Sequence, residues 1–253
     1  MIEQNLPVAI DVDAELESIA RRYKAASGVG INVLNLIGGQ AENLLERLPA
    51  SVRKQLEAAT VRALDHAMSA ASKSRDAVPD QASWLNSAVS AAMGAVGGAG
   101  GLPTALAELP VTTTLLLRVI EGVAVEHGFD PKSESVRFDC VQVFSAAGPL
   151  AQDDGSDLAF LTTRMALSGK AVQAVIHKVA PRLAVVMGQK LAAQTVPVLG
   201  AVAGAATNYA YTNYYQEMAH VHFSLRKLAI DADIDSEQLN MRLADKMRLL
   251  TVA

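Results

Sequence analysis

The 253-residue sequence contains one cysteine, few aromatic residues and little charge for its hydrophobic content. Cys140 alone excludes an internal disulfide and any zinc site built from several cysteines. Aromatic residues make up only 4% of the chain while hydrophobic residues make up 51%, a composition that favours closely packed helices of small and straight side chains. The net charge of −4 provides no overall positive field for nucleic acid. No secretory signal pattern opens the sequence, so we expect a reducing, cytoplasmic environment.

The sequence also lacks the motifs of the common enzyme classes. There is no Gly-x-Ser-x-Gly elbow, no phosphate-binding loop and no dinucleotide-binding fingerprint. The run Asp231-x-Asp233-x-Asp235 resembles the start of a calcium loop, but the turn glycine is missing and Arg242 occupies the twelfth position. We interpret it as a solvated connection before a capped helix, and we predict no cofactor and no metal.

Charge is absent from two long stretches, residues 81–107 and 191–216. Either is long enough to cross about 30 Å of hydrocarbon as a helix, and the mean hydropathy of the chain is high at +0.22. However, glycines and a proline interrupt the first stretch, and the second carries several side-chain amides and hydroxyls that are unusual on a lipid-facing span. We therefore favour buried helices, with a membrane span, reversible insertion and peripheral binding as alternatives.

No stretch alternates convincingly between apolar and polar residues, whereas apolar residues recur at helical spacing. We predict an all-α fold, a multi-helix bundle with glycine-rich close-packed or broken helices, forming a single domain over residues 1–253. The predicted helices cover 13–26, 31–48, 51–74, 80–93, 110–127, 131–147, 157–179 and a segment ending at 194, followed by one after Pro197 and a last one capped by Asp235.

Glycine and proline set most of the predicted boundaries. Gly28 and Gly30 are expected to interrupt the first helix, Pro110 to occupy the first turn of its helix, and Gly128 to end that helix. Pro181 is expected to separate two helices.

Three further segments have local signals of their own. The glycine-rich residues 94–103 predict a loop or a broken helix, and the polar residues 152–157 predict a linker. Asp235 with Gln238 forms a capping box, which places Leu239, Leu243, Met247 and Leu250 on the inner face of the last helix.

The segment after Pro197 begins with Gly200-x-x-x-Gly204, which places two glycines on one helix face and allows a second backbone to approach closely. Four tyrosines follow. Buried tyrosines need a partner for the hydroxyl group. For Tyr211 and Tyr215 we expect Asn208 and His222 as partners, and we include Asn208, Tyr211 and Tyr215 among the candidate ligand-binding residues.

Glu217-x-x-His220 has the spacing by which di-metal helical bundles supply two ligands. No second copy of this motif occurs, although Glu121, Glu126 and His127 are available on a neighbouring predicted helix. His220 and His222 lie about 200° apart around a helix, so we expect them to face different neighbours. Glu217 and His220 are kept as candidate ligand-binding residues, without a metal.

Arg118 and Glu121 lie three residues apart on an otherwise apolar predicted helix. A partly buried ion pair is the simpler interpretation, and an Arg118 that faces an anionic ligand such as a lipid headgroup is the alternative. Catalytic residues are not assigned, but a hydrolase site built from Arg118, Glu121, Glu217 and His220 remains an alternative hypothesis.

Two blocks of residues together resemble the EcsC family of bacterial proteins, over roughly residues 100–230. The first block contains Leu109-Pro110-Val111-Thr112-Thr113, Arg118-Val119-Ile120, Gly128 and Arg137…Cys140-x-x-Val143-Phe144. The second contains Pro197-Val198-x-Gly200-Ala201-Val202-x-Gly204-Ala205-x-x-Asn208-Tyr209 and Ala219-x-x-x-Phe223-x-x-Arg226-x-Leu228.

The founding member of that family is named for its place beside an ABC-type exporter. The resemblance therefore implies a non-enzymatic accessory role in the cytoplasm, peripheral at the inner membrane face, with membrane lipid or a membrane transporter as partner. A hydrolase and a triggered membrane-inserting protein are the alternatives. Neither a ligand nor an oligomeric state follows from the resemblance.

Overall fold

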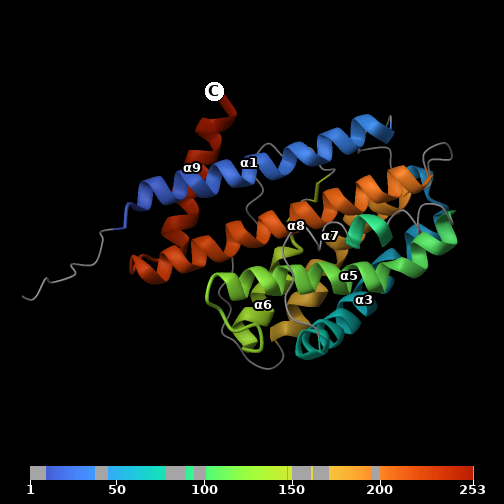
Figure 1. Ribbon diagram of the computed structural model, residues 1–253, viewed down its shortest axis with the longest axis horizontal. Coiled ribbons are helices and arrows are strands. Elements are labelled where there is room, and N and C mark those ends of the chain that lie inside the picture. The colour runs from blue at the N-terminus through green and yellow to red at the C-terminus, as the bar shows by residue number, and fades with distance from the viewer. Residues whose placement is uncertain are drawn as a thin grey trace, which may run out of the picture.

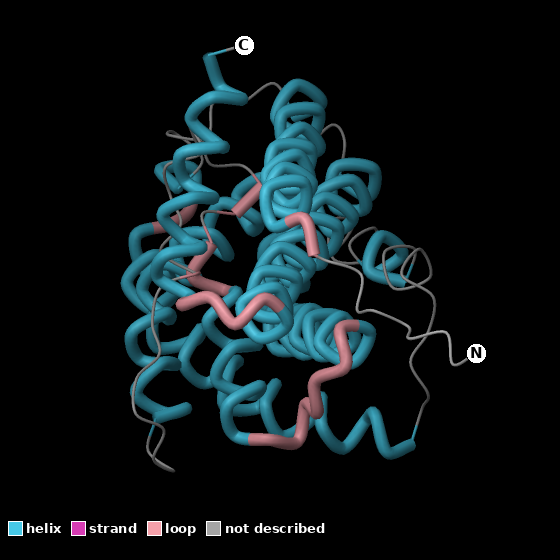
Figure 2. Tube along the Cα trace, turned by 90° about the vertical axis from the view of Figure 1, so that its left-hand side faces the viewer, coloured by secondary structure: helices cyan, strands magenta, loops and turns pink. Residues whose placement is uncertain are grey.

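A computed structural model describes residues 10–37, 45–77, 89–93, 101–146, 148–149, 161, 171–194 and 200–252. In these residues the chain forms helices and short connections, with no strand (Figure 2). The predicted all-α helical bundle is confirmed. The elements are α1 (Val12–Ile37), a short 3-10 helix η1 (Leu45–Arg47), α3 (Ala50–Ala77), α5 (Gly101–Glu126), α6 (Glu134–Val143), α7 (Ala171–Gln194), α8 (Gly200–Asp231) and α9 (Ser236–Val252).

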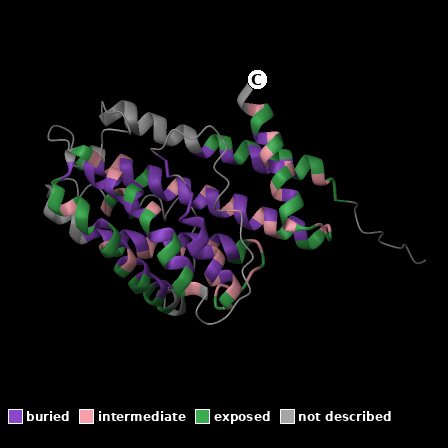
Figure 3. Ribbon diagram, turned by 180° about the vertical axis from the view of Figure 1, so that it is seen from behind, coloured by how far each residue is buried: buried purple, intermediate pink, exposed green. Residues whose placement is uncertain are grey.

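The longest helix, α8, organises the bundle. Its 32 residues span about 48 Å at the usual rise per residue, and it packs against α1, α5, α6, α7 and α9 (Figure 1). On the far side of α5 and α7 lies α3. Buried residues follow the middle of the bundle, whereas exposed and partly exposed residues make up most of α9 and of the start of α1 (Figure 3). The fold is thus α8 with α1 and α9 packed on it, with α5, α6 and α7 packed on it as well, and with α3 as a further layer beyond α5 and α7.

The direction of the helices determines which segments meet. Glu108 at the start of α5 bonds to Asn208, and His127 just after α5 lies beside His220, so α5 and α8 run in the same direction. Figure 1 shows α1 beside α8 in the opposite direction. The end of α1 and the starts of α5 and α8 therefore lie at one end of the molecule.

Several predicted helix ends are confirmed. Gly128 adopts a φ of +84° just after α5, a left-handed conformation that suits glycine. The carboxylate of Asp235 accepts hydrogen bonds from the backbone of Glu237 and Gln238 at 2.8 and 3.3 Å and so caps α9. Helix α6 begins later than predicted, because Ser133 rather than Asp130-Pro131 supplies its cap.

The predicted break at Gly28 and Gly30 is wrong, because α1 continues through both glycines to Ile37. The separate helix predicted over 31–48 is therefore also wrong in its first part, which belongs to α1. Each glycine costs about 1 kcal/mol of helix propensity. Packing of α1 along α8 outweighs that cost.

The two proline boundaries are wrong for the same physical reason. Pro110 and Pro181 lie inside α5 and α7, although an interior proline removes one backbone hydrogen bond at a cost of about 3 kcal/mol. The first-turn proline of α5 is Pro103 instead, because the helix begins at Gly101 within the segment predicted as a loop. Both helices are packed along their length, which offsets one missing bond.

The remaining predictions fall on residues outside the described part of the chain. These are most of the predicted helix 80–93, of which residues 89–93 are helical, the segment 94–100, the linker 152–157 and the start of the helix predicted at 157.

Candidate functional site

The three longest charge-free stretches of the sequence are residues 25–41, 81–107 and 191–216. Their described parts form the second half of α1, the start of α5 and the first half of α8. Helix α1 is antiparallel to α8, and α5 is parallel to α8. These parts of the three helices therefore lie together at one end of the bundle, on the right of Figure 1. We call this region the uncharged end and the opposite end, with the start of α1, the end of α8 and α9, the charged end.

The uncharged end has large apolar side chains on its surface. On α8, Val202 is 58% exposed and Tyr209 is 46% exposed. They lie two helical turns apart, so they share one face, which also carries Ala205 between them. Val89 is exposed too, and its neighbour Ser90 bonds to α8 through Asn208. An exposed apolar stripe without nearby charge on its own helix is typical of an interaction surface.

Beneath this surface lies a polar cluster in the interior. Glu108 of α5 and Lys190 of α7 form an ion pair at 3.3 Å, and the Lys190 side chain is fully buried. The same carboxylate oxygen, Oε1, accepts hydrogen bonds from the Thr112 hydroxyl at 3.0 Å and from the Asn208 amide at 2.7 Å. The second proton of that amide goes to the carbonyl of Ser90 at 2.9 Å. This cluster ties α5, α7, α8 and the helical residues 89–93 together.

The cluster is unevenly satisfied. Among the described residues no hydrogen-bond partner reaches Glu108 Oε2, Asn208 Oδ1 or the hydroxyl of Thr207, and all three are buried. Burial lowers the pKa of Lys190, and the attraction of Glu108 opposes that effect. In a buried ion pair, the free energy lost by removing both charges from water offsets much of their attraction. Replacing both partners by apolar residues therefore often leaves stability unchanged. It therefore holds the geometry of this end more than it adds stability.

The predicted tyrosine partners are wrong. The hydroxyl of Tyr211 donates to the backbone carbonyl of Val186 at 2.9 Å. Tyr215 packs edge-to-face on Phe144 and on Tyr214. The Tyr211 ring points toward α7, and the Tyr215 ring points toward Phe144 at the end of α6. Asn208 and His222 have other partners, Glu108 and Ser90 for Asn208 and Asp139 for His222. Burial raises the pKa of Tyr211 and Tyr215 well above the usual value, so both remain neutral packing residues.

Glu217 and His220 lie one turn apart on α8 but contact different elements. Glu217 forms an ion pair with Arg22 of α1 at 3.0 Å. His220 Nδ1 lies 3.2 Å from Nε2 of His127, and its Nε2 lies 3.8 Å from Glu126. Glu126 at the end of α5 and His127 just after it, which the sequence offered as further ligands, are therefore close to His220. In the described residues, however, no group of three or more histidines, cysteines or acidic residues is arranged to hold a metal ion.

The two imidazoles have lowered pKa values. Burial is the main cause that lowers the pKa of His220 to about 4, and the charges of Arg22 and His127 add to the same shift. Burial is also the main cause for His127, followed by Arg22 and Lys227. At neutral pH both rings are therefore uncharged, and one ring donates an N–H hydrogen bond to the other.

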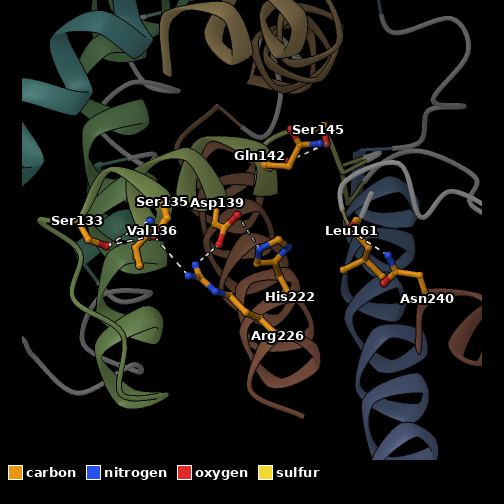
Figure 4. Close-up of polar contacts among 10 residues, drawn as sticks. All are labelled: Ser133, Ser135, Val136, Asp139, Gln142, Ser145, Leu161, His222, Arg226 and Asn240. Atoms are coloured by element: carbon orange, nitrogen blue, oxygen red, sulfur yellow. Dashed lines mark hydrogen bonds and ion pairs between the residues drawn. The ribbon is translucent and has the colours of Figure 1, made fainter. Parts of the chain in front are cut away.

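His222 faces away from His220, as expected from their spacing, and belongs to a third group of residues (Figure 4). Its Nε2 lies 3.5 Å from Asp139 of α6, and the same carboxylate pairs with Arg226. The guanidinium of Arg226 also lies 4.6 Å from the centre of the Phe129 ring. Burial alone would raise the pKa of Asp139, but His222 and Arg226 together lower it below its usual value. This group fastens α6 to the second half of α8.

Arg118 and Glu121 occupy the middle of α5. Glu121 is 1% exposed and Arg118 is partly exposed. Arg118 and Glu121 thus belong to α5, whereas Glu217 of α8 forms its ion pair with Arg22 of α1. Their direct ion pair and any role in ligand binding stay predictions.

Comparison with known proteins adds one finding. Residues 33–228 match the EcsC protein family, which is most of the chain. The chain belongs to the EcsC family. No curated protein and no solved structure gives a significant match.

The match begins much earlier than the resemblance over residues 100–230 indicated, and includes η1 and α3. Most of α1 and all of α9 lie outside it. In this EcsC-family protein those two helices nevertheless pack against each other and against α8. No described helix is both long enough and apolar enough to cross a membrane.

Proposed function

We propose that this EcsC-family protein is a peripheral membrane protein, which binds the bilayer surface through its uncharged end and acts there as a non-enzymatic accessory factor. The observation that carries the proposal is the gathering of three charge-free stretches at one end, with Val202 and Tyr209 exposed on it. Burying such side chains among lipid acyl chains is favourable by about 25 cal/mol per Å² of apolar surface. A tyrosine suits the interface, where its ring is buried and its hydroxyl stays hydrated.

The charge pattern supports a peripheral position rather than a span. The polar cluster around Glu108 and Lys190 lies in the interior just below the uncharged end, and deep insertion of this end would bring those charges toward hydrocarbon. Shallow contact leaves them inside the protein. The charged end then faces the aqueous side.

The alternative of a hydrolase has less support. A catalytic site requires its groups to reach a common substrate atom. Glu217 is engaged by Arg22, and His220 by His127, so each links α8 to a different neighbour. These contacts suit helix fastening.

Flotation with lipid vesicles tests the proposal. The double variant Val202→Glu/Tyr209→Glu should reduce the vesicle-bound fraction by about tenfold, because two carboxylates replace apolar contact. The matched control is Met241→Glu/Leu249→Glu, since those α9 residues are 59% and 72% exposed at the charged end. The control should bind as the wild type does. Absence of vesicle binding by the wild type, or equal loss in both variants, would contradict the proposal.

A further inference from the structure

Helix α1 is attached to the rest of the protein mainly through α8 and α9. Its apolar side chains at Leu16, Ile19, Ala20, Tyr23 and Ala26 are buried against these two helices. Because residues 12–32 and all of α9 lie outside the family match, the two helices form an addition to the matched core. The pair covers one side of α8.

Polar contacts at the rim hold this pair in place. Asp13 of α1 lies 3.2 Å from both Arg242 and Lys246 of α9. The ammonium of Lys24 donates to the carbonyl of Leu250. On the other edge Arg22 pairs with Glu217 of α8. We call these contacts the α1 clamp.

The clamp is weak by its position. The Asp13 side chain is 69% exposed, and the Arg22 side chain is 44% exposed. Exposed ion pairs contribute about 0–1 kcal/mol each and weaken further with salt. Most of the attachment of α1 therefore comes from its buried apolar face, and release of the helix requires that this face move from α8 to another apolar surface.

The sequence of α1 has the features of a helix that lies on a membrane surface. The apolar face includes Tyr23 within the basic run Arg21-Arg22-Tyr23-Lys24, the acidic residues of the helix (Asp13, Glu15 and Glu17) are confined to its start, and no charged residue occurs from 25 to its end. Basic residues beside an apolar face bind at the interface of bilayers that contain anionic lipids. Two of these basic side chains, Arg22 and Lys24, are the ones engaged in the clamp.

We infer that α1 is a releasable membrane anchor: anionic lipid headgroups compete with Glu217 and the Leu250 carbonyl for Arg22 and Lys24, and the freed helix lies on the bilayer with its apolar face. This inference rests on the proposed membrane binding and adds its regulation. The partner is a lipid surface that carries negative charge. Binding therefore opens the face of α8 that α1 covers in the closed protein.

The test uses the full-length protein with Asp13→Lys, which replaces the attraction of Arg242 and Lys246 by repulsion. Glu17→Lys is the matched control, because it makes the same change of charge on the same helix and its partner, Arg21, also lies within α1. Amide hydrogen exchange without lipid measures the clamp. Flotation with phosphatidylcholine vesicles, with and without phosphatidylglycerol, measures binding.

In Asp13→Lys, exchange in α1 and α9 should accelerate by about fivefold to tenfold while α5 and α7 are unchanged, and binding to anionic vesicles should rise by a similar factor. Glu17→Lys should leave exchange unchanged within about twofold, and its binding to anionic vesicles gives the effect of the added charge alone, which Asp13→Lys should exceed. Adding Lys246→Asp to Asp13→Lys should restore slow exchange.

Unchanged exchange in Asp13→Lys would overturn the clamp. Faster exchange without stronger anionic binding would overturn the anchor, and the proposed function would stand if Val202→Glu/Tyr209→Glu still lowered flotation. Equal binding to neutral and anionic vesicles would remove the headgroup competition. Failure of the wild type to bind any vesicle would overturn both proposals.

Discussion

The two ends of the bundle place their charges in opposite positions. At the uncharged end the surface carries Val202 and Tyr209, and the ion pair of Glu108 and Lys190 lies in the interior. At the charged end the inner face of α9 is apolar, and ion pairs such as that of Asp13 with Arg242 lie on the surface. The same helix, α8, passes through both environments. The contrast supports the proposed contact of the uncharged end with an apolar partner, because ordinary solvation would favour the arrangement of the charged end at both.

The difference also predicts how the two ends respond to change. A buried charge that loses its partner remains unsolvated, whereas an exposed charge is taken up by water. Substitutions at the uncharged end should therefore cost much more than equivalent ones at the charged end.

The largest effect is expected for Lys190→Met. This change leaves the carboxylate of Glu108 buried without its cation, and should lower the free energy of unfolding by about 3–5 kcal/mol, measured by urea denaturation. The double variant Glu108→Gln/Lys190→Met removes both charges and is the control. It should recover most of the loss, and a double variant as unstable as the single one would mean that the pair itself stabilises the bundle.

A second test concerns packing at the uncharged end. Gly204 is buried in the first half of α8, and Gly204→Leu should lower the free energy of unfolding by about 1–3 kcal/mol through overpacking. Ala205→Leu, one position further at a partly exposed site, is the control and should cost less. An unchanged melting temperature in Gly204→Leu would show that this face has room, contrary to a close helix crossing.

Local signals in the sequence predicted the fold class and several helix ends. The cap at Asp235 and the stop at Gly128 follow from side-chain chemistry and backbone conformation that depend on neighbouring residues only. The helices through Gly28, Pro110 and Pro181 were missed, because packing along α8 and between α5 and α7 overrides local propensity. Tertiary contact is not visible in a window of ten residues.

The candidate site was predicted only in part. Asn208 was recognised, but its partners were not, since Glu108 and Ser90 are about a hundred residues away. A partial signal existed: Glu108 follows one long charge-free stretch and Lys190 precedes the other, and their charges are opposite. Isolated opposite charges at the borders of apolar segments must find each other if both segments are buried. The close approach of α7 to α3 at Gly188 was also not predicted. A Cβ at Gly188 would lie 2.9 Å from Leu56 Cδ1, so only glycine fits there without a shift of that side chain.

A smaller effect is expected for the pH dependence of stability that arises from His220, in the second half of α8. The folded protein holds the pKa of His220 at about 4, below the unfolded value near 6.5. At His220 the unfolded chain therefore binds more protons between these values, so the contribution of His220 to stability is constant above about pH 6.5 and falls as the pH decreases toward 4. His220→Gln should flatten this slope in denaturation curves. A slope that His220→Gln leaves unchanged would assign the effect to another group.

The smallest effect is expected for the exposed pair between α1 and α8. Glu217→Gln keeps the shape of the side chain and removes its charge, so Arg22, which is 44% exposed, returns to water at little cost. We expect a loss of at most about 1 kcal/mol in the free energy of unfolding at low salt. In 1 M salt the Debye length is about 3 Å, so the difference from the wild type should largely disappear. The same salt should not rescue Lys190→Met, whose charge defect is shielded from ions by burial. If Glu217→Gln instead cost as much as Lys190→Met, or kept its full effect in 1 M salt, the contrast between an interior ion pair at one end and solvated pairs at the other would not hold.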